Sequence, residues 1–408
     1  MDRHKTDSRY AAARLLVTLA LMMIGASGMY VVPVVLPTVQ AEFGVARAAA
    51  STSYSLLMIG FGVGGLLMGR LADRFGVMVP LLIGAASMGI GFTAAAHAQH
   101  IWAFNLAHGF LIGLGSSATF SPLLADTSLW WVKRRGIAVA ICASGNYLGG
   151  AVWPPIVQAL VERHGWRPTY LGMALFGFAA MSALALLMRQ RPPLSQPTGP
   201  SAFANGVEGR PFGLSPTAAT VLLCIAGLAC CVAMSMPQVH IVAYCGDLGY
   251  GPARGAEMLS LMLACGIVSR LASGLICDRI GGMRTLILGS VLQGVALLLF
   301  LPFNGLVSLY VISALFGLFQ GGIVPSYAII VREHFPAREA GARVGAVIMC
   351  TMLGMALGGW MSGKIFDVTG SYQAAFVNGI AWNLLNLAIA VFLLRGTLKP
   401  KRIVHAPA

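Results

Sequence analysis

The chain has 408 residues, of which 10% are charged and 57% are hydrophobic. An ordinary soluble domain has about 25% charged residues, so this chain lacks the polar side chains needed to cover a water-exposed surface of its size. Its apolar runs are about 20 residues long, which is enough for a helix to cross a hydrocarbon core of roughly 30 Å. We therefore predict an all-α membrane protein and exclude a soluble globular one.

Twelve apolar runs follow one another along the chain, and the first is expected to be a membrane span because it lacks the cleavage site of a signal peptide. A polar segment rich in Ser, Gly and Pro separates the sixth run from the seventh. We expect a six-helix bundle over 1–189, a cytoplasmic linker over 190–215 and a second six-helix bundle over 216–408. The expected spans are 14–36, 50–69, 77–96, 101–125, 137–161, 168–188, 217–244, 255–276, 284–303, 306–331, 342–363 and 373–394.

The net charge of +14 is distributed unevenly between the loops. With the N-terminus inside, 21 of the 27 Lys and Arg residues fall on cytoplasmic segments. This bias follows the positive-inside rule and predicts that both termini are cytoplasmic. It accounts for the positive charge without a nucleic-acid partner. Five basic residues fall outside, and Arg270 belongs to neither side; the five are Arg47, Arg163, Arg167, Arg254 and Lys364.

A short loop motif occurs once in each half of the chain. The segment GRLADRFG at 69–76 recurs as GLICDRIG at 274–281, an offset of 205 residues, about half the chain length. Such duplication predicts two pseudo-symmetric halves with a site between them. We expect both copies to act as a cytoplasmic latch, because Gly permits close helix approach and Asp favours a neighbouring helix N-terminus. The alternative is a tight turn whose charges only fix the topology. The latch residues are Gly69, Asp73, Arg74, Gly274, Asp278 and Arg279.

Twelve spans, a long central linker and the Gly-x-Leu-Ala-Asp-Arg-x-Gly loop resemble the major facilitator superfamily. The resemblance covers nearly the whole chain. It implies a major facilitator fold, transport by rocker-switch alternating access, and a role for Asp73 and Arg74 in locking the cytoplasmic gate. The basic residues that commonly follow this motif are replaced by Val77-Met78-Val79, which predicts a weaker latch.

Arg270 is the one strong charge well inside an apolar run. Placing an arginine there costs at least about 2.5–3.5 kcal/mol on insertion scales, so a compensating role is expected. Its planar guanidinium matches a carboxylate through two hydrogen bonds, which predicts an anchor for an anionic substrate. The alternative is a structural cation that is bonded to helix carbonyls or paired with Asp126.

Two local patches resemble the monocarboxylate transporter family, namely GIVSR at 266–270 and WWVKRRGIA at 130–138. The resemblance implies that Arg270 binds the carboxylate of lactate-like acids. Gly266 replaces the acidic residue that animal members usually carry one turn before this arginine, and GASGMY at 25–30 replaces their acidic signature in the first span. The chain is thus similar to a bacterial branch near the oxalate/formate exchangers, which implies a bacterial inner membrane location.

The expected function is secondary active transport of a lactate- or pyruvate-like monocarboxylate, with proton symport. One alternative is an exchanger for oxalate-type dicarboxylates, although a dianion would require a second cation inside the membrane. Another is a non-transporting membrane sensor on the same fold. The expected partners are a small organic anion, H+ and the lipid bilayer, with no nucleic acid, and we expect a monomer.

Polar side chains within the spans are candidates for the substrate site and for proton transfer. Tyr30, Asn146, Tyr147 and Gln320 can contact a substrate through hydroxyl or amide groups. His240 and His108 are candidate proton carriers because imidazole titrates near neutral pH, and His240 is also a candidate for substrate binding. The alternative for both histidines, and the more common role of such a residue, is hydrogen-bonded packing. The sequence contains no metal-ligand cluster, phosphate-binding loop or nucleophile motif, so no metal, cofactor or enzyme activity is expected.

Overall fold

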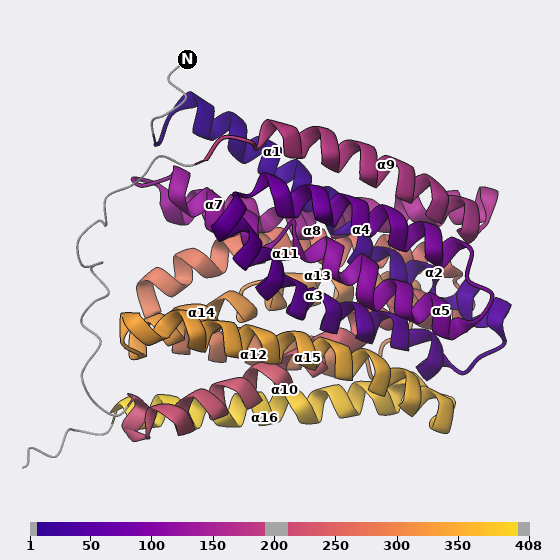
Figure 1. Ribbon diagram of the computed structural model, residues 1–408. Coiled ribbons are helices and arrows are strands. Elements are labelled where there is room, and N and C mark those ends of the chain that lie inside the picture. The colour runs from indigo at the N-terminus through magenta and orange to yellow at the C-terminus, as the bar shows by residue number, and fades with distance from the viewer. Residues whose placement is uncertain (1–5, 192–210, 399–408) are drawn as a thin grey trace, which may run out of the picture.

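The computed structural model of the protein describes residues 6–191 and 211–398, and these ranges are helical and contain no strand. Long helices run side by side between two ends of the molecule (Figure 1). The N-terminal helices are α1 (Arg9–Gly25), α2 (Ser27–Phe43), α3 (Arg47–Phe75), α4 (Met78–Ala96), α5 (Ile101–Leu106), α6 (Leu114–Ser117), α7 (Ser121–Trp130), α8 (Arg135–His164) and α9 (Trp166–Leu187). The C-terminal helices are α10 (Pro216–Asp247), α11 (Pro252–Ile280), α12 (Gly282–Leu299), α13 (Leu306–Gln320), α14 (Ile323–His334), α15 (Ala337–Thr369) and α16 (Tyr372–Leu398), preceded by the short turn η2 (Pro211–Gly213).

Eleven helices in the described ranges are long and apolar enough to cross a membrane. The expected span at 101–125 is the exception, because it is divided into α5, a π-helical segment η1 (Ala107–Gly113), α6 and α7. The π-helical backbone lies directly against α3, where a Cβ atom added at Gly60 would stand 1.9 Å from the Gly109 carbonyl oxygen. The broken segment still carries the chain across the molecule, from the end where α4 stops to the end where α8 begins. The all-α membrane fold predicted from the sequence is therefore confirmed, with one irregular crossing.

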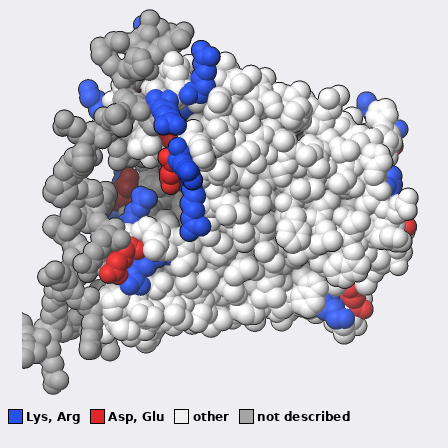
Figure 2. All heavy atoms as spheres, viewed as in Figure 1, with Lys and Arg blue, Asp and Glu red and all other residues white. Residues whose placement is uncertain are grey.

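The helices begin and end at two opposite ends of the molecule, the linker end and the Arg47 end. The linker end contains Trp130, Met188 and Pro211, and the Arg47 end contains Arg47, Asp247 and Thr369. In Figure 2, charged side chains gather at both ends of the visible face, with an uncharged belt between them. This distribution fits a molecule whose middle lies in lipid.

The N-terminal and C-terminal helices are in contact chiefly through α3 with α15 and through α8 with α11, and α3 packs tightly on α15 at the Arg47 end. Glycines on α15 make this possible. A Cβ atom at Gly359 would lie 3.2 Å from the Tyr54 ring, and one at Gly363 would lie 2.7 Å from the Ser51 hydroxyl. The Ser55 hydroxyl also donates to the Ala356 carbonyl at 2.6 Å. The two sets of helices are therefore closed against each other at this end.

Toward the linker end α3 and α15 separate. A Cβ atom at Gly62 on α3 would meet Met349 of α15 at 2.8 Å, whereas one at Gly69, two turns further along, would meet nothing within 4 Å. Gly345, one turn from Met349 on α15, likewise has nothing within 4 Å of its added Cβ atom. Figure 2 shows the molecule hollowed at this end, between its upper and lower parts. The conformation is closed at the Arg47 end and open at the linker end.

A buried ion pair holds the N-terminal helices together near the linker end. Arg14 of α1 donates to both carboxylate oxygens of Asp126 of α7, at 2.9 and 3.0 Å, and its side chain and that of Asp126 are 3% and 6% exposed. The guanidinium also donates to the Met188 carbonyl at 3.3 Å and lies over the Trp130 ring. Asp126 is thus the partner of Arg14, and the expected alternative pairing of Arg270 with Asp126 is wrong.

Replacing Asp126 with asparagine is expected to destabilise the protein strongly. The change leaves the buried Arg14 guanidinium without a counter-charge, a loss that typically costs about 3–5 kcal/mol. The measurement is the thermal unfolding midpoint of the purified protein in detergent. Glu257→Gln is the matched control, since Glu257 pairs with Arg254 on an exposed surface and such pairs contribute little. Equal shifts in the two variants would show that the Arg14–Asp126 pair has no special role.

Candidate functional site

Arg270 lies in the wall between the two sets of helices. Its Nη1 donates to the Ala143 carbonyl of α8 at 3.0 Å, and its Nε donates to the Gly321 carbonyl at 3.4 Å. The guanidinium lies over the Tyr147 ring, with 4.2 Å between its central carbon and the ring centroid. Arg270 thus touches the N-terminal helices through α8 and the C-terminal helices through the α13–α14 break. No acidic side chain among the described residues pairs with it.

Proline explains two of the carbonyl acceptors at this interface. In a regular helix the Gly321 carbonyl would accept from the residue four positions on, but that residue is Pro325, which has no N–H. Arg270 takes the vacant acceptor. Likewise Pro155 leaves the Ala151 carbonyl of α8 without its helical donor, and the Ser260 hydroxyl of α11 donates to it. The sequence therefore places free backbone acceptors where α11 meets its neighbours.

Three of the expected polar residues lie beside Arg270 or one another. Tyr147 stacks on the guanidinium, and the Tyr30 hydroxyl of α2 donates to the Asn146 side-chain oxygen of α8 at 3.1 Å. Arg270 is only half-buried, and its Nη2 group bonds to no described residue. Polar side chains of α2 and α8 thus lie beside the cation that α11 contributes.

Gln320 lies at the end of α13. It is fully buried, and its side-chain oxygen accepts from the Gln238 amide of α10 at 2.8 Å. Its own amide nitrogen has no hydrogen-bond partner among the described residues. Gln320 directly precedes Gly321, whose carbonyl accepts from Arg270, and its own side chain is bonded to α10.

The two histidines lie away from Arg270 in separate packing environments. His240 of α10 is fully buried at the Arg47 end, where its Nε2 faces the Gly359 carbonyl at 2.8 Å and its Nδ1 faces the Tyr372 hydroxyl at 2.9 Å. His108 lies in the π-helical segment, where its Nε2 faces the Tyr170 hydroxyl of α9 at 3.1 Å. The structure therefore does not bring either histidine together with the guanidinium.

The repeated loops are apart in this conformation. All four charged residues of the motif are exposed, and none forms an ion pair with a described residue; they are Asp73, Arg74, Asp278 and Arg279. Gly69 and Gly274 have open space around their Cα atoms. This arrangement is compatible with a latch that closes in another state, and it shows no latch contact in the state described.

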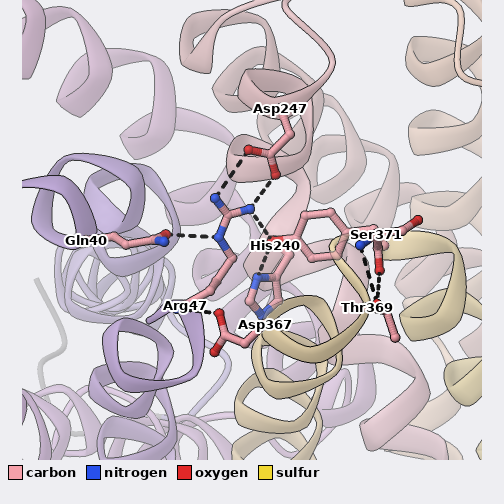
Figure 3. Close-up of polar contacts among 8 residues, drawn as sticks. Gln40, Arg47, His240, Asp247, Asp367, Thr369 and Ser371 are labelled. Atoms are coloured by element: carbon pink, nitrogen blue, oxygen red, sulfur yellow. Dashed lines mark hydrogen bonds and ion pairs between the residues drawn. The ribbon is translucent and has the colours of Figure 1, made fainter. Parts of the chain in front are cut away.

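A cluster that the sequence analysis missed closes the Arg47 end (Figure 3). Both terminal nitrogens of Arg47, at the start of α3, donate to the Asp247 carboxylate at the end of α10. Nη1 also donates to the Tyr372 hydroxyl at 3.0 Å, and Nε donates to the Gln40 side chain at 2.9 Å. The guanidinium packs over the Phe366 ring at 4.2 Å. Nearly every Arg47 donor is therefore used, chiefly on the C-terminal helices.

Asp367 of α15 adds a second link across the same boundary. Its two carboxylate oxygens accept from the backbone N–H groups of Arg47 and Ala48, at 2.8 and 2.9 Å. These N–H groups belong to the first turn of α3 and have no partner within that helix. A carboxylate there also interacts favourably with the helix dipole. Asp367 thus caps a helix of the opposite set, so the cap and the Arg47 contacts break together if this end opens.

Comparison with known proteins shows which family the chain belongs to. The model of the Major Facilitator Superfamily matches residues 17–309 and 223–407. The chain is 29% identical to monocarboxylate transporter 13 of Rattus norvegicus over 350 residues, covering 84% of this chain and 78% of that protein. It is 26% identical to the MFS-type transporter opdF of Penicillium oxalicum over 337 residues, covering 80% and 76%.

Solved structures agree on the fold. A bacterial homologue of the human lysosomal transporter Spinster, in an inward-facing and occupied conformation, superposes with a TM-score of 0.72 at 13% identity and covers 98% of this chain and 100% of its own. The nucleoside transporter NupG superposes with a TM-score of 0.70 at 15% identity, covering 92% and 99%. The chain is a multi-pass membrane transporter that belongs to the Major Facilitator Superfamily.

Proposed function

We propose that this protein carries a small organic monocarboxylate, of the lactate or pyruvate kind, across a bacterial inner membrane with a proton. The linker end, with both termini, faces the cytoplasm, and the Arg47 end faces outward. The halves 1–189 and 216–408 move about the site between them. The inward-open form described here then delivers substrate to the cytoplasm.

The single observation that carries this proposal is the state of Arg270. It is a half-buried cation between the two sets of helices, it has no acidic partner among the described residues, and part of its guanidinium is free. A carboxylate can take two of its N–H donors in one plane. Tyr30, Asn146, Tyr147 and Gln320 would then contact the rest of the acid. The likeness to a rat protein named as a monocarboxylate transporter supports the same substrate class.

Exchange of a dicarboxylate, the alternative function, has less support than transport of a monocarboxylate. A dianion requires a second free cation, but the buried arginines Arg14 and Arg47 are each bonded to a carboxylate. Lys364 is exposed near the Arg47 end of α15. Exchange of oxalate-type anions is therefore an alternative result that the uptake experiment below can detect.

The test is uptake into proteoliposomes containing the purified protein. We expect labelled lactate or pyruvate to accumulate when the outside is made acidic, and accumulation to collapse when the pH gradient is dissipated. Labelled oxalate should compete poorly. Uptake that ignores the pH gradient and requires internal substrate would replace symport by exchange, and binding without flux would favour a membrane sensor.

A further inference from the structure

The hydrogen bonds around His240 have a fixed direction. The Gly359 carbonyl can only accept, so the imidazole proton lies on Nε2. Nδ1 is then the acceptor and receives the Tyr372 hydroxyl proton. The Tyr372 oxygen in turn accepts from Nη1 of Arg47. A single chain of bonds therefore runs from Arg47 on α3 to the α15 backbone, and it requires a neutral imidazole.

A protonated His240 does not fit this arrangement. Both ring nitrogens would be donors, so Nδ1 would have to donate to the Tyr372 oxygen and turn the tyrosine proton away. Only the Tyr372 hydroxyl would separate the imidazolium from the Arg47 guanidinium, so two positive charges would lie close together. The other charged or titratable groups facing this place are Asp247 at the end of α10, Asp367 on α15, and Tyr244 and Tyr372. Neither carboxylate bonds to the imidazole, since Asp247 is held by the Arg47 side chain and Asp367 by the α3 backbone.

We infer that His240 is the pH sensor of an outer gate made by Arg47, Asp247, Asp367 and Tyr372, and that the gate closes only on a neutral imidazole. Protonation from an acidic outside then favours the outward-open form, in which Arg47 has left Tyr372 and the tyrosine oxygen is free to accept from a protonated Nδ1. For a group that binds its proton only in the open form, the opening equilibrium rises by up to about tenfold per pH unit. The inference rests on the proposed alternating access and on no particular substrate acid.

Hydrogen–deuterium exchange of the substrate-free protein in nanodiscs tests this inference. The peptides to follow cover 47–55 on α3 and 359–372 at the end of α15, with exchange times scaled for the intrinsic effect of pH. We expect both peptides to lose protection as the pH falls from about 8 to about 5.5. In His240→Gln they should stay protected across this range, because the Gln amide can donate to Gly359 and accept from Tyr372 but does not titrate.

His108→Gln is the matched control, since His108 is also a buried histidine bonded to a tyrosine but lies within the N-terminal helices. It should keep the wild-type pH response. Tyr372→Phe provides a second variant if His240→Gln does not fold, and it should weaken protection at every pH and flatten the response. Wild-type protection that does not change with pH would overturn the inference. So would a response that survives in His240→Gln but disappears in Asp367→Asn, which would make the carboxylate the sensor.

The exchange experiment tests the His240 sensor independently of the proposed binding of a carboxylate by Arg270. Arg270 bonds to Ala143 and Gly321 and to none of the gate residues, so Arg270→Ala should retain the pH-dependent exchange even when it transports nothing. A lost response in Arg270→Ala would show that the pH effect arises at the central site, against a sensor at His240.

Discussion

Arg270→Ala and Arg270→Lys are both expected to abolish uptake of labelled lactate or pyruvate. Replacing the arginine removes at least two charge-assisted hydrogen bonds to the substrate carboxylate, each contributing about 1.5–3 kcal/mol. Loss of two such bonds lowers the efficiency of uptake by more than about a hundredfold. Lysine restores the charge but not the planar pair of donors, and its single ammonium cannot also bridge the Ala143 and Gly321 carbonyls. Initial uptake rates over a range of substrate concentrations measure the effect.

Arg254→Lys on the same helix is the matched control. Arg254 is exposed near the start of α11 and pairs with Glu257 one turn away, so its replacement should leave uptake unchanged. Size-exclusion profiles and unfolding midpoints show whether each variant remains folded. Folded Arg270 variants that transport at the wild-type rate would remove the carboxylate anchor from the proposed function.

The helices and the position of Arg270 could be predicted from sequence because they depend on local properties. Apolar runs of membrane length fix the spans, and an arginine inside such a run is conspicuous on its own. The hydrogen-bond partners of Arg270 were harder to predict from sequence. Its bond to the Gly321 carbonyl depends on Pro325, a signal that is present in the sequence but becomes meaningful only once α11 is known to pass beside the α13–α14 break.

The missing acidic residue before Arg270 also has a structural reason. A Cβ atom at Gly266 would stand 2.4 Å from the Tyr147 ring, so the ring fills the space that a larger side chain would need. The departure from the animal members is thus a change in packing across the two sets of helices. Sequence alone shows the glycine and not the ring that requires it.

The Arg47 cluster was beyond sequence reasoning for a different reason. Arg47, Asp247 and Asp367 each lie near the end of an apolar run, where a charge is ordinary. Their importance comes from tertiary pairing, because residues from α3, α10 and α15 meet at one point. The repeated loops are the converse case, since their pattern is plain in the sequence but they make no latch contact in this conformation.

Arg47→Gln is expected to open the Arg47 end of the protein. The variant loses the charge-assisted bonds to Asp247 and the bond to Tyr372, which join α3 to the C-terminal helices. Loss of even one such bond, at about 1.5–3 kcal/mol, shifts the ratio of closed to open molecules by about tenfold to a hundredfold. The Asp367 cap remains, because it uses the backbone of Arg47 and Ala48. Adding Asp367→Asn should therefore increase the effect.

A cysteine at position 55 reports this opening, since Ser55 is buried beneath the cluster and donates to Ala356 across the boundary. Right-side-out vesicles are treated with a membrane-impermeant maleimide, and peptide mass spectrometry reads position 55 separately from the native cysteines. Labelling should be slow in Ser55→Cys alone and faster by at least about tenfold when Arg47→Gln is added. Arg167→Gln is the matched control, because Arg167 pairs with Glu42 within the N-terminal helices and its loss leaves the boundary intact. If labelling stays equally slow with and without Arg47 in folded protein, the packing of α3 against α15 must hold the Arg47 end closed without the ion pair.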